Sequence, residues 1–283
     1  MLARILTNRL LEGPPKSTAP LIDDCWPSFI RTGPHGPYRF HVNARQGPAP
    51  TVIAVHGWTS GAAHARNRTQ VLADAGFNVV LLESLGHGTS TYNAEWTAHC
   101  ILDCLEDLLD GVFDGSVDLS ATDVFLHGHS LGAYVVLRSL RGRHGNLVRA
   151  LLLESPMTCY SPILDEALAN VIWVRWIPGF RKRLERALMA RWNRLHPEVT
   201  INDISDVDVP RWSKPDLPTF VMQADPDRRL GPVHLDALLS CVDSVHLDVW
   251  KSSTLRHSGT SEHALRDEAM MAWLVSKDFI PRC

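Results

Sequence analysis

The amino-acid sequence predicts an α/β fold in which a single domain, residues 1–283, is built around a mostly parallel β-sheet with helices on both faces. First, short apolar runs rich in β-branched residues alternate with longer stretches whose apolar residues recur every three or four positions, as strands and helices do in such folds. Second, 45% of the 283 residues are hydrophobic, which is enough for one large core. Third, several apolar runs end in polar residues, and these folds bind ligands beyond the carboxyl ends of their strands.

Composition and charge exclude several classes of function. The net charge of −3 and the isoelectric point near 6.5 argue against a nucleic-acid-binding protein, because such proteins are usually basic. The cysteines are scattered and form no Cys-x-x-Cys pair and no Cys/His metal spacing. We therefore expect reduced thiols, a cytoplasmic protein, and neither a cofactor nor a metal ion. The six cysteines are Cys25, Cys100, Cys104, Cys159, Cys241 and Cys283.

The N-terminal stretch from Met1 to Leu11 is apolar but is interrupted by Arg4, Asn8 and Arg9. It is too short and too charged to span a membrane, and no small-residue cleavage site follows it. A short amphipathic helix that packs on the body or touches a membrane surface fits this composition. We predict no stable membrane insertion and at most a transient contact with a membrane surface.

The first third of the chain predicts one edge of the sheet and two buried strands. Residues Ser28 to Arg31 and Tyr38 to Val42 read as the strands of a hairpin near the edge, joined by a turn rich in Gly and Pro. Continuous apolar runs at Thr51 to Val55 and Asn78 to Leu82 are typical of buried strands. Between them a helical pattern stops at Gly76, a residue suited to ending a helix.

The remaining elements continue the alternation of strands and helices. An amphipathic helix is predicted over Ala94 to Leu109, where apolar residues repeat at intervals of three and four. A strand beginning at Asp123 then leads into a helical segment from Ala133 to Leu140. Three further apolar runs predict the last strands, at Ala150 to Leu153, Phe220 to Gln223 and His246 to Trp250.

Residues 157–218 break this alternation and predict a helical lid over the ligand pocket. The segment is inserted just past a strand end and is long for a connection in a compact domain. It holds two predicted helices, several prolines and the tryptophans Trp173, Trp176, Trp192 and Trp212. One helix carries an apolar stripe beside a basic surface, which we interpret as a packed helix with a solvated face rather than a membrane-docking helix. The stripe is Phe180, Leu184, Leu188, Trp192 and Leu195.

The pentad Gly128-His129-Ser130-Leu131-Gly132 lies between a predicted strand and a predicted helix. A strand that turns sharply into a helix around a serine is a nucleophile elbow, in which the serine backbone is strained and the residues two positions away are small. The hydroxyl then stands free at the sheet edge, and the amide of Leu131 lies at the positive end of a helix, where an oxyanion is stabilised. We interpret Ser130 as a nucleophile rather than as an incidental serine in a Gly-rich turn.

A serine nucleophile needs a base that is oriented by an acid, and on this kind of fold the chain order is serine, acid, histidine. Two acids, Asp225 and Asp227, follow the predicted strand that ends at Gln223. We prefer Asp227 as the orienting acid, with Asp225 second and Glu154, just after the preceding strand, third.

Two histidines compete for the role of base. His257 lies in a loop, which can deliver its ring to the serine, whereas His263 opens a helical run; we prefer His257. His56, His87 and His129 precede the acid in the chain and are interpreted as structural or pocket-lining. The second oxyanion donor is expected from the turn after the Thr51 strand, through the backbone amide of Trp58.

These motifs resemble those of the α/β-hydrolase superfamily, in particular its lidded serine esterases, monoacylglycerol lipases and related thioesterases. The resemblance extends from about Thr51 onward and rests on His56-Gly57-Trp58, on Gly86-His87-Gly88-Thr89-Ser90 and on the pentad around Ser130. Asp227 matches the family's acid position, although Ala224 replaces the usual glycine there and His257 lacks the customary preceding glycine. The resemblance implies an eight-stranded sheet with the lid inserted after the sixth strand.

The resemblance also implies a function: a serine hydrolase that cleaves a small hydrophobic carboxylic ester through an acyl-enzyme. Ser130, Asp227 and His257 would form the catalytic triad, and the amides of Trp58 and Leu131 the oxyanion hole. A thioesterase, a lactonase or a carbon–carbon bond hydrolase would use the same residues. Outside the enzymes, the alternative is a non-catalytic member that binds a hydrophobic ligand. A serine at this position argues against haloalkane dehalogenases and epoxide hydrolases, which need a carboxylate there.

Overall fold

The computed structural model describes residues 7, 11–14, 21, 23–169, 177–209, 211, 214–259 and 261–280. Of the N-terminal stretch from Met1 to Leu11, only Thr7 and Leu11 are among them, so the predicted amphipathic helix lies largely outside the described residues. The same holds for three tryptophans of the segment 157–218, namely Trp173, Trp176 and Trp212.

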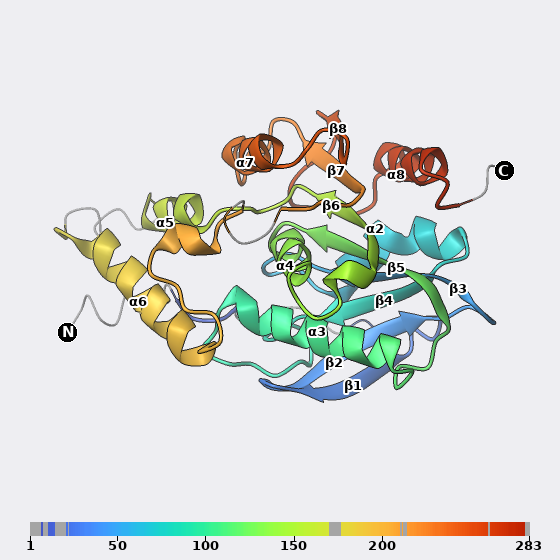
Figure 1. Ribbon diagram of the computed structural model, residues 1–283, viewed down its shortest axis with the longest axis horizontal. Coiled ribbons are helices and arrows are strands. Elements are labelled where there is room, and N and C mark those ends of the chain that lie inside the picture. The colour runs from blue at the N-terminus through green and yellow to red at the C-terminus, as the bar shows by residue number, and fades with distance from the viewer. Residues whose placement is uncertain are drawn as a thin grey trace.

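A single eight-stranded sheet forms the centre of the protein, with the strand order β1-β2-β4-β3-β5-β6-β7-β8 (Figure 1). Strand β2 pairs antiparallel with β1 and with β4, and all other neighbours pair in parallel. The sheet is therefore mostly parallel with an antiparallel hairpin at one edge, which confirms the predicted fold class. The strands are β1 (Ser28–Gly33), β2 (Gly36–Asn43), β3 (Ala49–Val55), β4 (Asn78–Glu83), β5 (Ala121–His129), β6 (Val148–Glu154), β7 (Thr219–Ala224) and β8 (Leu247–Ser252).

Helices cover both faces of the sheet, as the unbroken apolar character of the central strands requires. The side chains of α3, α4 and α7 belong to one apolar cluster, and those of α2 and α8 belong to a second cluster on the opposite face. Strands β4 and β7, buried along their whole length, lie between these layers. The helices are α2 (Ala62–Asp74), α3 (Ala98–Phe113), α4 (Leu131–Ser139), α5 (Tyr160–Ala169), α6 (Phe180–Leu195), α7 (Val233–Cys241) and α8 (Ala264–Ser276).

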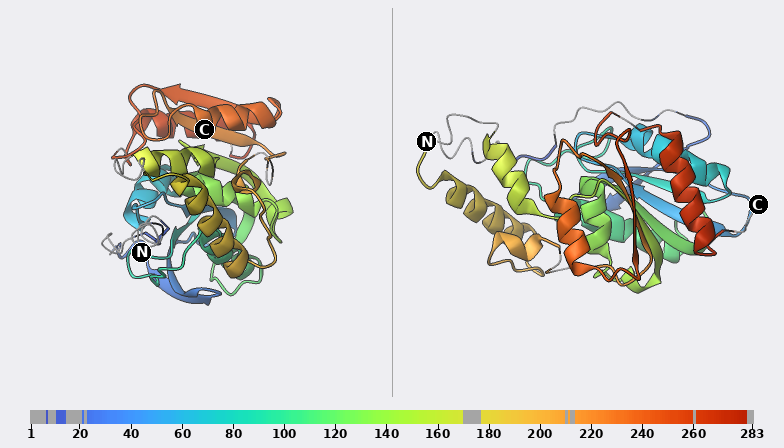
Figure 2. Two further views of the ribbon diagram at one scale, coloured as in Figure 1. Left: turned by 90° about the vertical axis from the view of Figure 1, so that its left-hand side faces the viewer. Right: turned by 90° about the horizontal axis from the view of Figure 1, so that it is seen from above.

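The β6–β7 connection (residues 155–218) places α5 and α6 at one end of the molecule, apart from the helices that flank the sheet (Figures 1 and 2). Four of the five stripe residues predicted on α6, namely Phe180, Leu184, Leu188 and Trp192, are buried, and Leu195 packs against the same core. On the opposite side of the helix, the basic side chains of Lys182, Arg183 and Arg186 are exposed. This helix therefore packs through its apolar stripe and exposes its basic face.

Within the described residues, no helix combines the length and the apolar character needed to cross a membrane.

A buried ion-pair cluster joins the carboxyl end of β6 to the helices on one face of the sheet. The Glu154 carboxylate accepts hydrogen bonds from Arg68 of α2 at 2.9 Å and from Arg266 of α8 at 3.2 Å. The side chain of Glu154 is fully buried, and those of Arg68 and Arg266 nearly so. Burial alone would raise the pKa of Glu154, but the nearby positive charges, first that of Arg68, lower it to about 2.

Glu154→Gln should therefore destabilise the protein strongly, since it leaves the buried guanidinium group of Arg68 without its counter-charge and that of Arg266 with only the carboxylate of Asp267. We expect a loss of about 3–5 kcal/mol in the free energy of unfolding, the range typical of breaking a buried pair by removing one partner. Urea denaturation followed by circular dichroism measures this loss. If the free energies of unfolding of the wild type and Glu154→Gln differ by less than about 1 kcal/mol, the ion-pair cluster contributes little to stability.

The same contact predicts a pH dependence. Because the pKa of Glu154 is lower in the folded protein than its ordinary value of 4.5, its contribution to stability is fully present above pH 4.5 and is lost as the pH falls from about 4.5 to about 2. Unfolding titrations across this window should show a steeper fall for the wild type than for Glu154→Gln. Equal slopes of stability against pH for the two proteins would contradict the lowered pKa of Glu154.

Candidate active site

Ser130 stands between β5 and α4 in a backbone conformation that few residues adopt. Its φ of 53° and ψ of −115° lie outside the regions that side chains with a Cβ normally occupy, and such conformations cost on the order of 1–3 kcal/mol each. Strand β5 ends at His129 and α4 begins at Leu131, so the whole change of direction takes place at this one residue. The sharp turn predicted from the pentad is therefore present.

The glycines around Ser130 are required by close approaches of the backbone. A Cβ on Gly128 would lie 2.5 Å from the Cα of Ala133, and a Cβ on Gly132 would overlap the carbonyl of Val55 at the end of β3. Gly57, in the loop after β3, faces the turn itself, because its Cβ would lie 3.2 Å from the Cβ of Ser130. Small residues thus allow β3, β5 and α4 to meet at the serine.

A chain of hydrogen bonds connects Ser130 to His257 and Asp227. The Oγ of Ser130 lies 2.9 Å from Nε2 of His257, and Nδ1 of the same ring lies 2.8 Å from Oδ2 of Asp227. The carboxylate can only accept, so Nδ1 carries the proton and Nε2 is left to accept from the serine hydroxyl. The structure thus brings together the three side chains that the sequence analysis singled out.

The carboxylate of Asp227 is held on both of its oxygens. Oδ1 accepts from the backbone N–H groups of Arg229 and Leu230, each at 2.9 Å, while Oδ2 also accepts from Gln223 at 3.3 Å. Burial works to raise the pKa of Asp227, but the hydrogen bond from His257 and those from the two backbone amides outweigh it and lower the pKa. Asp227 therefore faces His257 as an anion at neutral pH.

The alternative candidates for acid and base have other partners. Asp225 is exposed, and its carboxylate lies 3.9 Å from the amine of Lys251. Glu154 is held by the two arginines described above. His263 is the N-cap of α8: its Nδ1 accepts from the backbone N–H of Arg266 at 3.0 Å. None of these three side chains is bonded to Ser130 or to the His257 ring in the part of the chain described here.

The structure also gives His129 a role that the sequence analysis did not specify. Its Nε2 lies 2.8 Å from the backbone carbonyl of His257 and donates a hydrogen bond to it. The rest of the ring is buried against the loop that contains Gly57. His129 thus anchors the loop that carries His257, and only its position next to Ser130 could have indicated this.

His56 joins two loops at the carboxyl edge of the sheet. Its Nδ1 donates to the carbonyl of Gly57 at 2.9 Å, and its Nε2 accepts from the backbone N–H of Ser84 at 3.1 Å. Burial lowers the pKa of His56 to about 3, so the ring is neutral. The structural interpretation of His56 agrees with these contacts.

The backbone amides of Trp58 and Leu131 are the predicted oxyanion donors. Leu131 is the first residue of α4, where the backbone N–H groups have no partner within the helix and the helix dipole is positive. Both residues line the cavity that contains Ser130 and His257. The start of a helix stabilises negative charge, so the position of Leu131 is compatible with the predicted role of its amide.

A cavity of about 320 Å³ opens onto Ser130. Its walls come from the loops at the sheet edge and from the β6–β7 connection, which contributes apolar residues of α5 and α6. These residues are Tyr160, Ile163, Leu164 and Leu188. Trp58 and Trp96, in edge-to-face contact at 5.0 Å, form another part of the wall. One ion pair, between Arg229 and Glu166, ties the loop after β7 to α5.

Comparisons with known proteins place these observations in context. The sequence profile of the Alpha/beta hydrolase family matches residues 52–277, whereas no curated protein sequence matches the chain significantly. Among solved structures, an esterase from Pyrococcus furiosus has a TM-score of 0.66 at 15% identity, with 94% of this chain and 98% of that chain covered.

Two further solved structures are similar over most of the chain. An α/β serine hydrolase without a lid from Xanthomonas campestris has a TM-score of 0.59 at 17% identity, covering 93% of this chain and 99% of that one. The mouse alpha/beta hydrolase domain-containing protein 10 has a TM-score of 0.58 at 16% identity, covering 89% of this chain and 98% of that one. At these identities, the likeness concerns the fold.

The close approach of α4 to β3 predicts that Gly132→Ala destabilises the protein, because the new methyl group overlaps the backbone of Val55, which cannot move aside without disturbing the sheet. In Gly111→Ala, on α3, the new methyl group meets side chains only, the end of Arg31 and a methyl group of Val117. That second change should cost less than Gly132→Ala, since side chains shift more easily than strand backbone and alanine is the better helix former by about 1 kcal/mol. Thermal unfolding of both variants measures the difference, and equal melting temperatures would contradict the tight contact at Gly132.

Proposed function

This chain belongs to the alpha/beta hydrolase family, and from that premise we propose that it is a serine hydrolase that cleaves carboxylic esters through an acyl-enzyme. The observation that carries the proposal is the unbroken hydrogen-bond chain from Ser130 through His257 to Asp227. A serine hydroxyl is a weak nucleophile by itself and becomes reactive when a base takes its proton.

In the first step, Ser130 Oγ attacks the carbonyl carbon of the ester while Nε2 of His257 takes the hydroxyl proton. The ring becomes positively charged, and the anionic Asp227 at Nδ1 stabilises that charge and fixes the ring orientation. His257 then passes the proton to the departing alcohol. The bond between carbonyl carbon and leaving oxygen breaks, and the acyl group remains on Ser130.

In the second step, a water molecule attacks the acyl-enzyme. His257 takes a proton from the water and returns it to Ser130 Oγ as the bond between the serine and the acyl group breaks, which releases the carboxylic acid. In both steps the negative charge on the carbonyl oxygen is stabilised by the amides of Trp58 and Leu131. Each such donor is worth about 2.7–4 kcal/mol in the transition state.

The cavity supports a small hydrophobic ester as the substrate. Its volume of about 320 Å³ is at the low end of the range of about 300–1,000 Å³ typical of small-molecule sites. Aliphatic side chains from α4, α5 and α6 line the space beside Ser130, so an acyl chain would be buried there. We propose that residues 157–218 act as the lid of this pocket, since α5 and α6, which line the cavity beside Ser130, both belong to this segment.

Ser130→Ala should abolish the hydrolysis of a short p-nitrophenyl ester, because it removes the nucleophile and leaves the fold intact. We expect kcat to fall by about 10⁶-fold, as in other serine hydrolases, while the circular dichroism spectrum and melting temperature stay close to those of the wild type. Residual activity within tenfold of the wild type would refute the proposed nucleophile. A panel of ester, thioester and lactone substrates, tested in parallel, identifies the bond cleaved, and a wild type inactive on all of them would favour the non-catalytic alternative.

Two neighbouring aspartates provide a matched pair of variants. Asp227→Asn keeps the size of the side chain but removes the charge that faces His257 and permits the wrong ring tautomer, so we expect kcat to fall by about 10⁴-fold. Asp225→Asn should leave kcat within about twofold, because the Asp225 carboxylate is exposed and lies near Lys251 rather than at His257. Steady-state kinetics on the same ester measures both. The reverse order would transfer the role of the acid to Asp225.

A further inference from the structure

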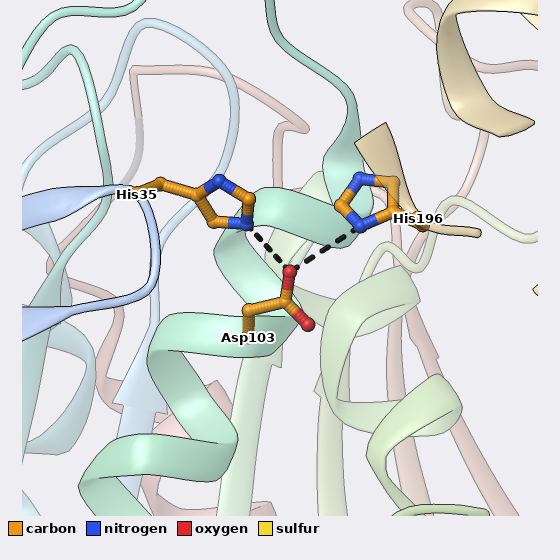
Figure 3. A group of neighbouring side chains, drawn as sticks. All are labelled: His35, Asp103 and His196. Atoms are coloured by element: carbon orange, nitrogen blue, oxygen red, sulfur yellow. Dashed lines mark hydrogen bonds and ion pairs between the residues drawn. The ribbon is translucent and has the colours of Figure 1, made fainter. Parts of the chain in front are cut away.

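A second cluster of titratable side chains lies outside the cavity of Ser130. His35, in the turn between β1 and β2, and His196, directly after α6, both face Asp103 on α3 (Figure 3). His196 is 99% buried, and the side chains of His35 and Asp103 are 14% and 23% exposed. Three segments that are far apart in the sequence therefore bring two imidazoles and one carboxylate to one point.

The two histidines lie at different distances from the Asp103 carboxylate. Nε2 of His35 lies 2.6 Å from Oδ2 of Asp103, a short charge-assisted hydrogen bond. Nδ1 of His196 lies 3.4 Å from the same oxygen, which is long for a hydrogen bond. In a tetrahedral zinc site, with ligands at about 2.0–2.1 Å from the metal, neighbouring ligand atoms lie about 3.3 Å apart. The spacing of His196 and Asp103 fits two ligands of one metal ion better than it fits a direct bond.

Two further side chains continue this spacing on the other side of His196. Nε2 of His99 lies 3.5 Å from Oδ1 of Asp103 and 3.5 Å from Oε1 of Glu198. The same Glu198 oxygen lies 3.9 Å from Nδ1 of His196. His99 and Glu198 thus form, with His196, a second group of ligand atoms next to that of His35 and Asp103.

The far side of the His196 ring is arranged as in a metal ligand. Its Nε2 lies 2.8 Å from the hydroxyl oxygen of Thr97, which can accept a hydrogen bond from a proton on Nε2; in that tautomer the electron pair of Nδ1 faces Asp103 and is available to a metal ion. Metal-binding histidines commonly donate their second N–H in this way, which fixes the tautomer. The thiol of Cys100 lies on the same far side, 3.7 Å from Nε2.

Asp103 and His99 also line a hollow of about 610 Å³ beside α3, whose other charged lining residues are Glu106, Asp107 and the arginines Arg138, Arg141, Arg143 and Arg211. It is separate from the cavity at Ser130, because the two share no lining residue among those described.

We propose that His35, Asp103 and His196 bind a divalent transition-metal ion of the zinc type, with His99 or Glu198 as the fourth ligand. Imidazole and carboxylate are ligands that suit Zn²⁺. Binding displaces the proton shared by His35 and Asp103 and replaces their hydrogen bond with two bonds to the metal. The ion would tie the end of α6 to α3 and to the hairpin at the sheet edge, and α6 also contributes Leu188 to the wall of the Ser130 cavity.

Calorimetric titration of Zn²⁺ into tag-free, chelator-treated full-length protein tests the proposal. We expect one ion per chain, proton release on binding, and a higher melting temperature with metal. Asp103→Asn and His196→Ala should each weaken binding by at least about 100-fold, since even partners of the ligands are worth about 10–100-fold. Thr97→Val, which removes such a partner, should weaken it by about 10–100-fold.

His144→Ala provides the control. His144 also pairs with an aspartate of α3, Asp110, at 2.6 Å, but it has no place in the cluster, so this variant should bind Zn²⁺ as the wild type does. Circular dichroism of each variant shows whether it is folded. Absence of binding in the wild type, or equal binding in folded Asp103→Asn and wild type, would overturn the proposal and leave the cluster as an ion-pair network. The outcome is independent of hydrolase activity, because calorimetry measures metal binding directly, and of the residues changed only Thr97 also lines the Ser130 cavity.

Discussion

The whole active region depends on one strained backbone position. Ser130 changes the direction of the chain by itself, between the last residue of β5 and the first residue of α4. That conformation is unfavourable in isolation, so it persists only because the surrounding elements leave the chain no other course. Gly132 lets α4 approach β3, and Gly128 lets the start of the helix pack on β5. The same tight junction directs the hydroxyl out of the sheet and places an unpaired helix N-terminus beside it.

The histidine opposite Ser130 is positioned from two directions. Its ring is held by Asp227, and its backbone carbonyl is held by the ring of His129, the residue before the serine. The strained turn therefore presents the nucleophile and at the same time anchors the loop of its base. The backbone amides of Arg229 and Leu230 keep the Asp227 carboxylate in place. Each of the three side chains is thus fixed by contacts from neighbouring segments, which is the preorganisation that such chemistry needs.

The sequence predicted the sheet well, because its signal is local. Every predicted strand is present and differs from the observed one by at most three residues at either end, since buried strands of a parallel sheet are continuous apolar runs. Helix α7 was not predicted: it has nine residues, and both Val233 and Leu239 are exposed, so no clear apolar stripe marks it. The helix predicted from Ala94 begins at Ala98, because Thr97 is extended and serves as its N-cap.

The site was predictable where a motif fixes a role, and unpredictable where the fold alone brings residues together. The pentad pointed to Ser130, and chain order pointed to an acid and a histidine after it. Chain order alone did not choose between Asp225 and Asp227; the resemblance of their loop to the acid loop of the family pointed to Asp227. The cluster of His35, Asp103 and His196 carries no spacing signal at all, because its members lie 68 and 93 residues apart along the chain.

The central claim is that the fold makes the hydroxyl of Ser130 a nucleophile, and reaction with a fluorophosphonate tests it most directly. Mass spectrometry of the digested protein should locate a single stoichiometric adduct on the peptide that contains Ser130, and the reaction should be far slower in His257→Ala. A folded wild-type protein that remains unmodified at Ser130, or reacts equally fast without His257, would contradict the account.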